Sequence, residues 1–327
     1  MSTSPWFYVA FTFFVLAVLA LDLGVFHRKA HVVRPREAGI WVGIWMTLAL
    51  LFAGGIYFRA GGDNALLFLT GYLIEQSLSV DNLFVIVMLF SSFGTPDKYQ
   101  HRVLFWGILG ALVMRGLFIG MGSWLILKIG WIMYLFGAFL IVTGVRMALK
   151  RDEEFDPEQN VVMRTARRFL PIITSYDGQR FFSIRNGRRV ATPLLLVLLM
   201  VEFTDLVFAL DSIPAIFAVT TDPFLVYTSN VFAILGLRSM YFLLSGIVHK
   251  FIYLKYGLAF ILAFVGTKMV AVDFVHVPTL VSLGVIVTML SATILISLKY
   301  PPKAEDVIDE REGKTGSIFG SIQPPEQ

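Results

Sequence analysis

Two of the most apolar stretches of this chain carry oxygen-bearing side chains that a lipid-soluble helix should exclude. The candidate ligands are Glu75, Asp81 and Asn82 within residues 69–90, and Glu202, Asp205, Asp211 and Ser212 within residues 192–219. An ionised carboxylate near the bilayer centre costs about 2.5–3.5 kcal/mol on insertion scales. Because intramembrane acids with that cost usually serve a function, we interpret these seven residues as one site.

The donor types indicate which ligand the site would take. The side chains offer carboxylate, amide and hydroxyl oxygens. The chain has no Cys, and none of its 5 His falls in either stretch. Oxygen donors suit manganese, magnesium or calcium, whereas zinc, copper and nickel favour imidazole or thiolate. The sequence therefore predicts a site for a hard divalent cation.

Helical spacing predicts that the donors of each stretch converge. Glu75 and Asn82 are seven residues apart and share a helix face, as do Glu202 and Asp205 at a spacing of three. In a straight helix Asp211 would point away from Glu202.

Pro214 suggests that the second acidic helix is not straight. Proline has no backbone N–H, so the Leu210 carbonyl loses its helical partner. We expect a break there, with an unwound turn at Asp211 and Ser212 that presents backbone and hydroxyl oxygens beside the carboxylates.

A structural interpretation of the same residues stays open. The acids could pair with Arg115 and Arg238 to lock the bundle, and we expect these arginines to be counter-charges rather than ligands. Two arginines cannot neutralise five acids, which favours a functional site. Ser77 and Thr204 could support the site, or could bond the backbone carbonyl one turn back, which is the commoner use of such hydroxyls.

The composition specifies the elements that must position these side chains. Apolar residues make up 57% of the 327 residues, and the mean hydropathy is +0.74. Such a chain has too little polar surface for a soluble fold. Apolar runs long enough to cross about 30 Å of hydrocarbon recur near 6–26, 39–58, 66–90, 103–122, 131–149, 192–219, 227–248, 256–273 and 279–298. We predict an all-α polytopic membrane bundle of about nine transmembrane helices, the first a retained helix rather than a signal peptide.

The basic residues predict how the bundle is oriented. Of the 27 Lys and Arg residues, 21 lie in alternate loops and the C-terminal tail, and only Arg59 and Lys128 lie in the opposite loops. Because basic loops stay in the cytoplasm, the N-terminus is expected outside and the C-terminus inside. The net charge of +4 reflects this bias and does not imply nucleic acid. No protein partner is indicated.

An internal repeat underlies the predicted domain organisation. Each acidic span is followed by a span with one arginine, and then by a span that begins on an aromatic-Gly pair (FGAFLIVTGVRM and YGLAFILAFVGTKM). The copies would be inverted about the membrane plane, as in many transporters. The predicted units are two N-terminal helices (1–64), a first three-helix repeat (65–150), a cytoplasmic linker (151–190), a second repeat (191–274), a last helix (275–300) and a disordered tail (301–327).

The linker from 150 to 190 is expected to hold little regular structure. We predict a short amphipathic helix and a β-hairpin whose turn is Asn186-Gly187.

The motifs together resemble a known family. GYLIEQSLSVDNLFV, VEFTDLVFALDSIPAIFAVTTDPFLVYTSNVFAILGLRSMYFLL and KYGLAFILAFVGTKM are similar to the TerC family of bacterial membrane proteins, especially its Alx branch. The resemblance covers about residues 5–300 and places the family's acidic motifs on the seven candidate ligands. It implies a LysE-type transporter that exports manganese from the cytoplasm. Labels of tellurium resistance and redox modulation also attach to the family.

We therefore expect a secondary transporter in the bacterial inner membrane, whose cargo is Mn²⁺ and whose coupling ion could be the proton. The chain has no G-x-x-x-x-G-K-[ST] loop for ATP. Two other classes stay open: a membrane stress or assembly scaffold with the acids in ion pairs, and a metalloenzyme using Glu75 or Glu202 as general base. The second lacks the usual His ligands, so no enzyme activity is expected.

Overall fold

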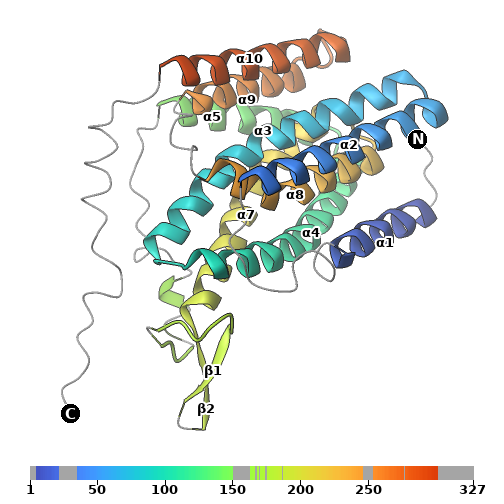
Figure 1. Cartoon of the computed structure of the whole chain (residues 1–327). Coiled ribbons are helices and arrows are strands. Elements are labelled where there is room, and N and C mark those ends of the chain that lie inside the picture. The colour runs from blue at the N-terminus through green and yellow to red at the C-terminus, as the bar shows by residue number, and fades with distance from the viewer. Residues whose placement is uncertain are drawn as a thin grey trace.

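The computed structural model describes residues 5–21, 35–149, 163–165, 168, 170–173, 175–185, 187–245, 253–275 and 277–300. Within these residues the fold is almost entirely helical, with one small hairpin (Figure 1). The elements in chain order are α1 (Pro5–Leu21), α2 (Pro35–Ala60), α3 (Gly62–Ser92), α4 (Asp97–Lys128), α5 (Ile132–Leu149), β1 (Phe182–Arg185), β2 (Arg188–Ala191), α7 (Pro193–Phe217), α8 (Pro223–Leu244), α9 (Leu254–Val270) and α10 (Thr279–Lys299).

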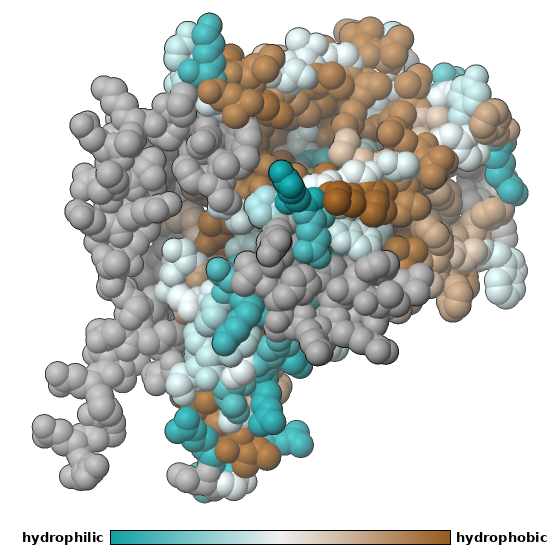
Figure 2. All heavy atoms as spheres, in the orientation of Figure 1, coloured by the Kyte–Doolittle hydropathy of each residue, from teal (hydrophilic) through white to brown (hydrophobic). Residues whose placement is uncertain are grey.

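The helices confirm a polytopic helical membrane protein. In the described part of the chain, α2, α3, α4, α5, α7 and α10 are long and apolar enough to cross a bilayer. Each of the other three predicted spans also coincides with a helix, but α1 and α9 have only 17 residues. Large apolar side chains are exposed along the helices, such as Leu117 and Leu51. Figure 2 shows hydrophobic residues, in brown, over much of the helical bundle, and many hydrophilic residues, in teal, in the region of the hairpin.

Helices α3 and α4 are longer than the predicted spans. They contain 31 and 32 residues, where the apolar runs 66–90 and 103–122 predict shorter elements. At about 1.5 Å per residue, each exceeds the thickness of the hydrocarbon. The difference arises because polar turns such as DKYQHR, at the start of α4, continue the helix past the apolar run.

Helix α7 corrects the expectation of an unwound turn. It runs unbroken through Asp211 and Ser212 to Phe217, with Pro214 inside it. Proline removes one hydrogen bond, but Pro214 stands in the last turn, and its own carbonyl accepts from the backbone N–H of Ala218 at 3.0 Å. The lost bond therefore falls where the helix is about to end.

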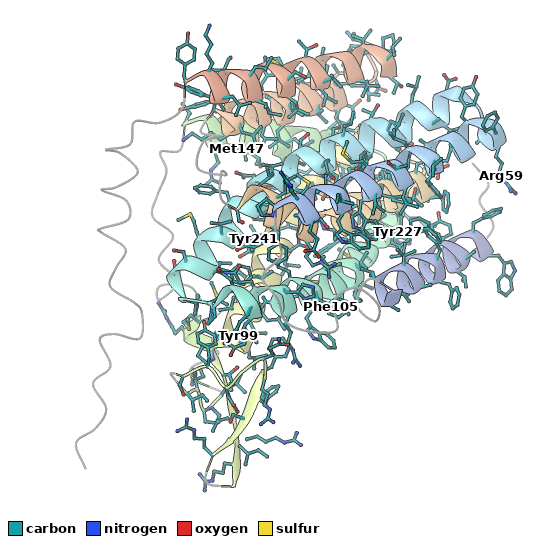
Figure 3. All side chains as sticks on the ribbon, in the orientation of Figure 1. Arg59, Tyr99, Phe105, Met147, Tyr227 and Tyr241 are labelled. Carbon is teal, nitrogen blue, oxygen red and sulfur yellow. The ribbon has the colours of Figure 1, made fainter. Side chains whose placement is uncertain are left out.

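Helix α8 is enclosed by other helices and is the most buried element. It starts at an N-cap, where the Asp222 carboxylate accepts from the backbone N–H of Phe224 at 2.9 Å and Pro223 takes the first helical position. It packs against α2, α3 and α4. Its labelled side chains Tyr227 and Tyr241 lie within the bundle (Figure 3). Because protein rather than lipid surrounds it, α8 can carry more polar residues than an exposed span.

The two predicted triplets, α3–α4–α5 and α7–α8–α9, contact each other in a reciprocal pattern. Helix α3 packs on α8 while α4 packs on α7, and α5 packs on α9. In the last pair, a Cβ on Gly137 would lie 2.8 Å from the Gly266 carbonyl, and one on Gly144 would lie 2.6 Å from the Ala259 carbonyl. The later residue of α5, Gly144, meets the earlier residue of α9, Ala259, so these two helices are antiparallel.

The predicted hairpin is confirmed. Strands β1 and β2 pair antiparallel with Arg185 opposite Arg188, and Gly187 has a φ of 72°, which suits glycine in a two-residue turn. Tyr176, just before the hairpin, donates its hydroxyl to the Phe93 carbonyl at 2.9 Å, and its burial raises the pKa of the phenol. The linker is therefore tied to the α3–α4 turn. Most of the predicted amphipathic helix and the whole tail after Tyr300 lie outside the described residues.

Candidate functional site

Arg115, on α4, lies at the centre of the charged site. Its guanidinium bonds the carboxylate of Glu75 on α3 and both carboxylate oxygens of Asp205 on α7, at 3.0 Å from Nη2 and 3.4 Å from Nε. Nη1 also lies 3.4 Å from the Ser212 hydroxyl and 3.4 Å from the amide oxygen of Asn230 on α8. One side chain thus connects four helices, which include members of both triplets.

The site lies inside the protein rather than at its surface. The side chain of Arg115 is 1% exposed, that of Glu75 is 0% and that of Asp205 is 16%. Among the described residues, the second carboxylate oxygen of Glu75 and the amide nitrogen of Asn230 have no hydrogen-bond partner. Burial of such groups is costly. The arginine therefore satisfies only part of the cluster.

Glu202 lies beside this cluster, where it approaches the backbone of α4. It is one helical turn before Asp205. A Cβ on Gly110 would overlap the Glu202 carboxylate, so only glycine leaves room for this side chain. Within the described residues, Glu202 has no basic partner, and Arg115 is the only base bonded to Glu75 or Asp205. Arg115 thus binds two carboxylates, those of Glu75 and Asp205, while the third, Glu202, lies beside Asp205 without a basic partner among the described residues.

Asp211 faces a different neighbour. Its carboxylate accepts from the Thr143 hydroxyl on α5 at 3.3 Å. The next residue, Ser212, belongs to the Arg115 cluster, because successive side chains of the unbroken α7 point in different directions. Asp211 therefore connects the charged helices to the α5–α9 pair.

The remaining predicted ligands follow Glu75 along α3. Asn82 is buried and Asp81 is partly buried. In the described part of the chain, no three His, Asp or Glu side chains are grouped closely enough to hold a metal ion. Of the predicted set, the structure joins Glu75, Asp205 and Ser212 through Arg115, with Glu202 adjacent. It does not gather all seven into one shell.

The supporting residues divide in the same way. Ser77 donates to the Leu73 carbonyl at 2.5 Å and Thr204 to the Met200 carbonyl at 2.7 Å, so both hydroxyls bond one turn back along their own helices. Arg115 forms ion pairs with Glu75 and Asp205. Arg238 is buried on α8, 5% exposed.

Sequence reasoning missed Asn230, Thr143 and Gly110. Asn230 was detectable in principle, because it is a buried amide in an apolar helix that also carries Arg238. Thr143 and Gly110 gave no signal, since threonine and glycine are common in membrane helices.

Comparisons with known proteins agree with the geometry of a multi-helix membrane protein. The profile of the integral membrane protein TerC family matches residues 60–305. The chain belongs to the TerC family. No solved structure matches it.

Relatives of this TerC protein match along nearly all of their length. A Myxococcus xanthus protein named "Uncharacterized membrane protein STKORF319" is 57% identical over 295 residues, which are 90% of this chain and 92% of the relative. An Escherichia coli K12 protein named "Putative membrane-bound redox modulator Alx" is 50% identical over 303 residues, 90% and 94% of the two chains. A Rickettsia bellii membrane protein is 40% identical over 291 residues, 89% and 96%.

Proposed function

We propose that this TerC protein is a secondary transporter that exports divalent manganese across the bacterial cytoplasmic membrane. The observation that supports it is the excess of carboxylate at a four-helix junction: Arg115 pairs with Glu75 and Asp205, and Glu202 beside Asp205 has no basic partner among the described residues. A bundle that needed only internal ion pairs would gain nothing from the third acid. A transported cation would account for this third acid, because it needs carboxylate ligands inside the membrane.

The reciprocal helix contacts support an inverted repeat. Exchanging α3–α4–α5 with α7–α8–α9 converts the α3–α8 contact into the α7–α4 contact and leaves α5–α9 unchanged. The antiparallel α5 and α9 are the counterparts that inversion requires. In this proposal all nine helices cross the membrane, and the carboxylates lie at the junction of two halves that rock against each other.

The position of the loops supports the proposed topology. Tyr176, in the linker just before the hairpin, bonds the α3–α4 turn, so two segments of the predicted cytoplasmic side share one end of the bundle. Tyr99 lies at that end and Arg59 at the other (Figure 3). Tyr134 bonds Asp273, which joins the first turn of α5 to the turn after α9 on the opposite side. We assign the hairpin end to the cytoplasm from its arginines.

The choice of manganese and the outward direction follow from the TerC resemblance, and the oxygen donors are compatible with them. Proton exchange is the proposed coupling. The E. coli relative carries the words "redox modulator" in its name. Since this chain has no Cys, we attribute a redox effect to altered manganese levels rather than to thiol chemistry.

A scaffold role is the second candidate. The ion pairs of Arg115 with Glu75 and Asp205 favour it, because they alone could hold four helices together. In that case the hairpin would recruit partners and no ion would cross.

Glu202→Gln separates the two candidates, because Glu202 has no basic partner among the described residues. Purified protein in vesicles should lose manganese flux with this variant while its thermal unfolding stays close to that of the wild type. Asp63→Asn, an exposed carboxylate at the start of the same helix as Glu75, is the matched control and should transport normally. Full flux in both Glu202→Gln and Asp211→Asn, or none in the wild type, would favour the scaffold.

A further inference from the structure

The guanidinium of Arg115 occupies a position that would suit a bound cation. Carboxylates of Glu75 and Asp205, the Ser212 hydroxyl and the Asn230 amide oxygen surround it from three other helices. These are the donor types that hard divalent cations take. Arg115 therefore fills the oxygen shell that the proposed substrate would use.

The same cluster has capacity that the arginine leaves unused. Within the described residues, the second carboxylate oxygen of Glu75 lacks a partner, although the side chain is 0% exposed. A compact doubly charged ion could engage both oxygens of Glu75, whereas the guanidinium bonds only one.

We propose that Arg115 is a tethered counter-ion of the empty site, which the transported cation displaces from Glu75 and Asp205. This inference rests on the proposed transport function. After each release, a secondary transporter must return its empty site to the other face of the membrane. Buried carboxylates without a cation make that step strongly unfavourable. Arg115 neutralises two of them from within the chain.

A tethered counter-ion and a purely structural arginine affect different transport steps. Net efflux requires the empty site to return, whereas exchange of manganese for manganese carries a loaded site in both directions. Loss of the counter-ion slows only net efflux. Loss of a structural ion pair impairs both processes.

The test uses manganese itself as the probe. Wild type, Arg115→Gln and Arg115→Lys are purified with manganese, reconstituted in manganese-loaded vesicles, and diluted into buffer with or without manganese. In Arg115→Gln we expect net efflux to fall about tenfold or more while exchange stays within about twofold. Arg115→Lys keeps the positive charge and should recover part of the net efflux. Arg146→Gln, an exposed arginine on α5, is the matched control and should change neither flux.

A second readout separates competition from packing. If Arg115 competes with the metal, manganese should raise the thermal midpoint of Arg115→Gln more than that of the wild type. Equal effects on net efflux and exchange in folded Arg115→Gln would overturn the inference. Should this variant not fold, a lower ratio of net efflux to exchange in Arg115→Lys supports the inference, and an unchanged ratio overturns it. Absence of both fluxes in the wild type would instead refute transport, and the inference with it.

Discussion

The Arg115 junction and the α5–α9 contact hold the same bundle together by opposite physical means. At the junction, Arg115 joins Glu75 and Asp205 through charge-assisted hydrogen bonds, and some polar atoms stay unsatisfied. Between α5 and α9, Gly137 and Gly266 let two backbones approach until no side chain fits between them. Close packing of small residues is a usual source of helix association in lipid.

In the proposed transport cycle, the α5–α9 contact supplies stability and the Arg115 junction exchanges ligands. Well-packed glycines stabilise one arrangement, because any added atom collides with backbone. A charged cluster can be satisfied by more than one cation, at a cost in stability. We therefore regard the α5–α9 contact as the fixed element and the junction as the adjustable one.

Removal of Arg115 should have the largest effect on folding. Arg115→Ala leaves the carboxylates of Glu75 and Asp205 without their cation, which should lower the free energy of unfolding by about 3–5 kcal/mol without metal. Thermal unfolding in detergent measures it, with Arg146→Ala as control. A loss below about 1 kcal/mol would mean that the carboxylates are compensated elsewhere. Added manganese should restore part of the loss.

The α5–α9 contact is tested with a single methyl group. Gly137→Ala places a Cβ 2.7 Å from the Val270 side chain and 2.8 Å from the Gly266 carbonyl. Because that backbone cannot move freely, the variant should lose about 1–3 kcal/mol of stability. Gly284→Ala on α10, where nothing lies within 4 Å of the new Cβ, is the matched control and should be neutral or slightly stabilising. Equal stability of both variants would show that α5 and α9 can move apart to accommodate the added methyl group.

The sequence anticipates much of this fold because lipid constrains it strongly. Apolar runs locate every described helix, and the Asn186-Gly187 pair locates the hairpin. The break predicted at Pro214 is wrong because the effect of a proline depends on its distance from the helix end, which the apolar run does not reveal. Glu75, Asp205 and Ser212 were found as polar exceptions in apolar helices.

The contacts that the site residues make between helices could not be predicted in the same way. That Arg115 meets Asn230 and Thr143 meets Asp211 depends on how α4, α5, α7 and α8 are packed and rotated about their axes. Neither composition nor spacing within one helix specifies that packing.

Gly110 offers a subtler test of the junction. Gly110→Ala places a Cβ against the Glu202 carboxylate, which is the far end of a flexible side chain and can move away. Stability should therefore change by less than about 1 kcal/mol, while manganese flux falls about tenfold because Glu202 is displaced. Gly120→Ala on the same helix, which meets nothing within 4 Å, should keep normal flux. Normal flux in Gly110→Ala would remove Glu202 from the site.

The smallest expected effect concerns the link between the two regions. Thr143 on α5 donates to Asp211 on α7, so this bond joins the fixed contact to the adjustable junction. Thr143→Val removes the donor but keeps the shape, and should cost about 0.5–1.5 kcal/mol of stability. Its effect on manganese flux should vanish in the Asp211→Asn background if the two residues act only through this bond, which a double-mutant cycle measures. Additive effects on flux would mean that Asp211 acts independently of α5, and that the two regions are not coupled through this pair.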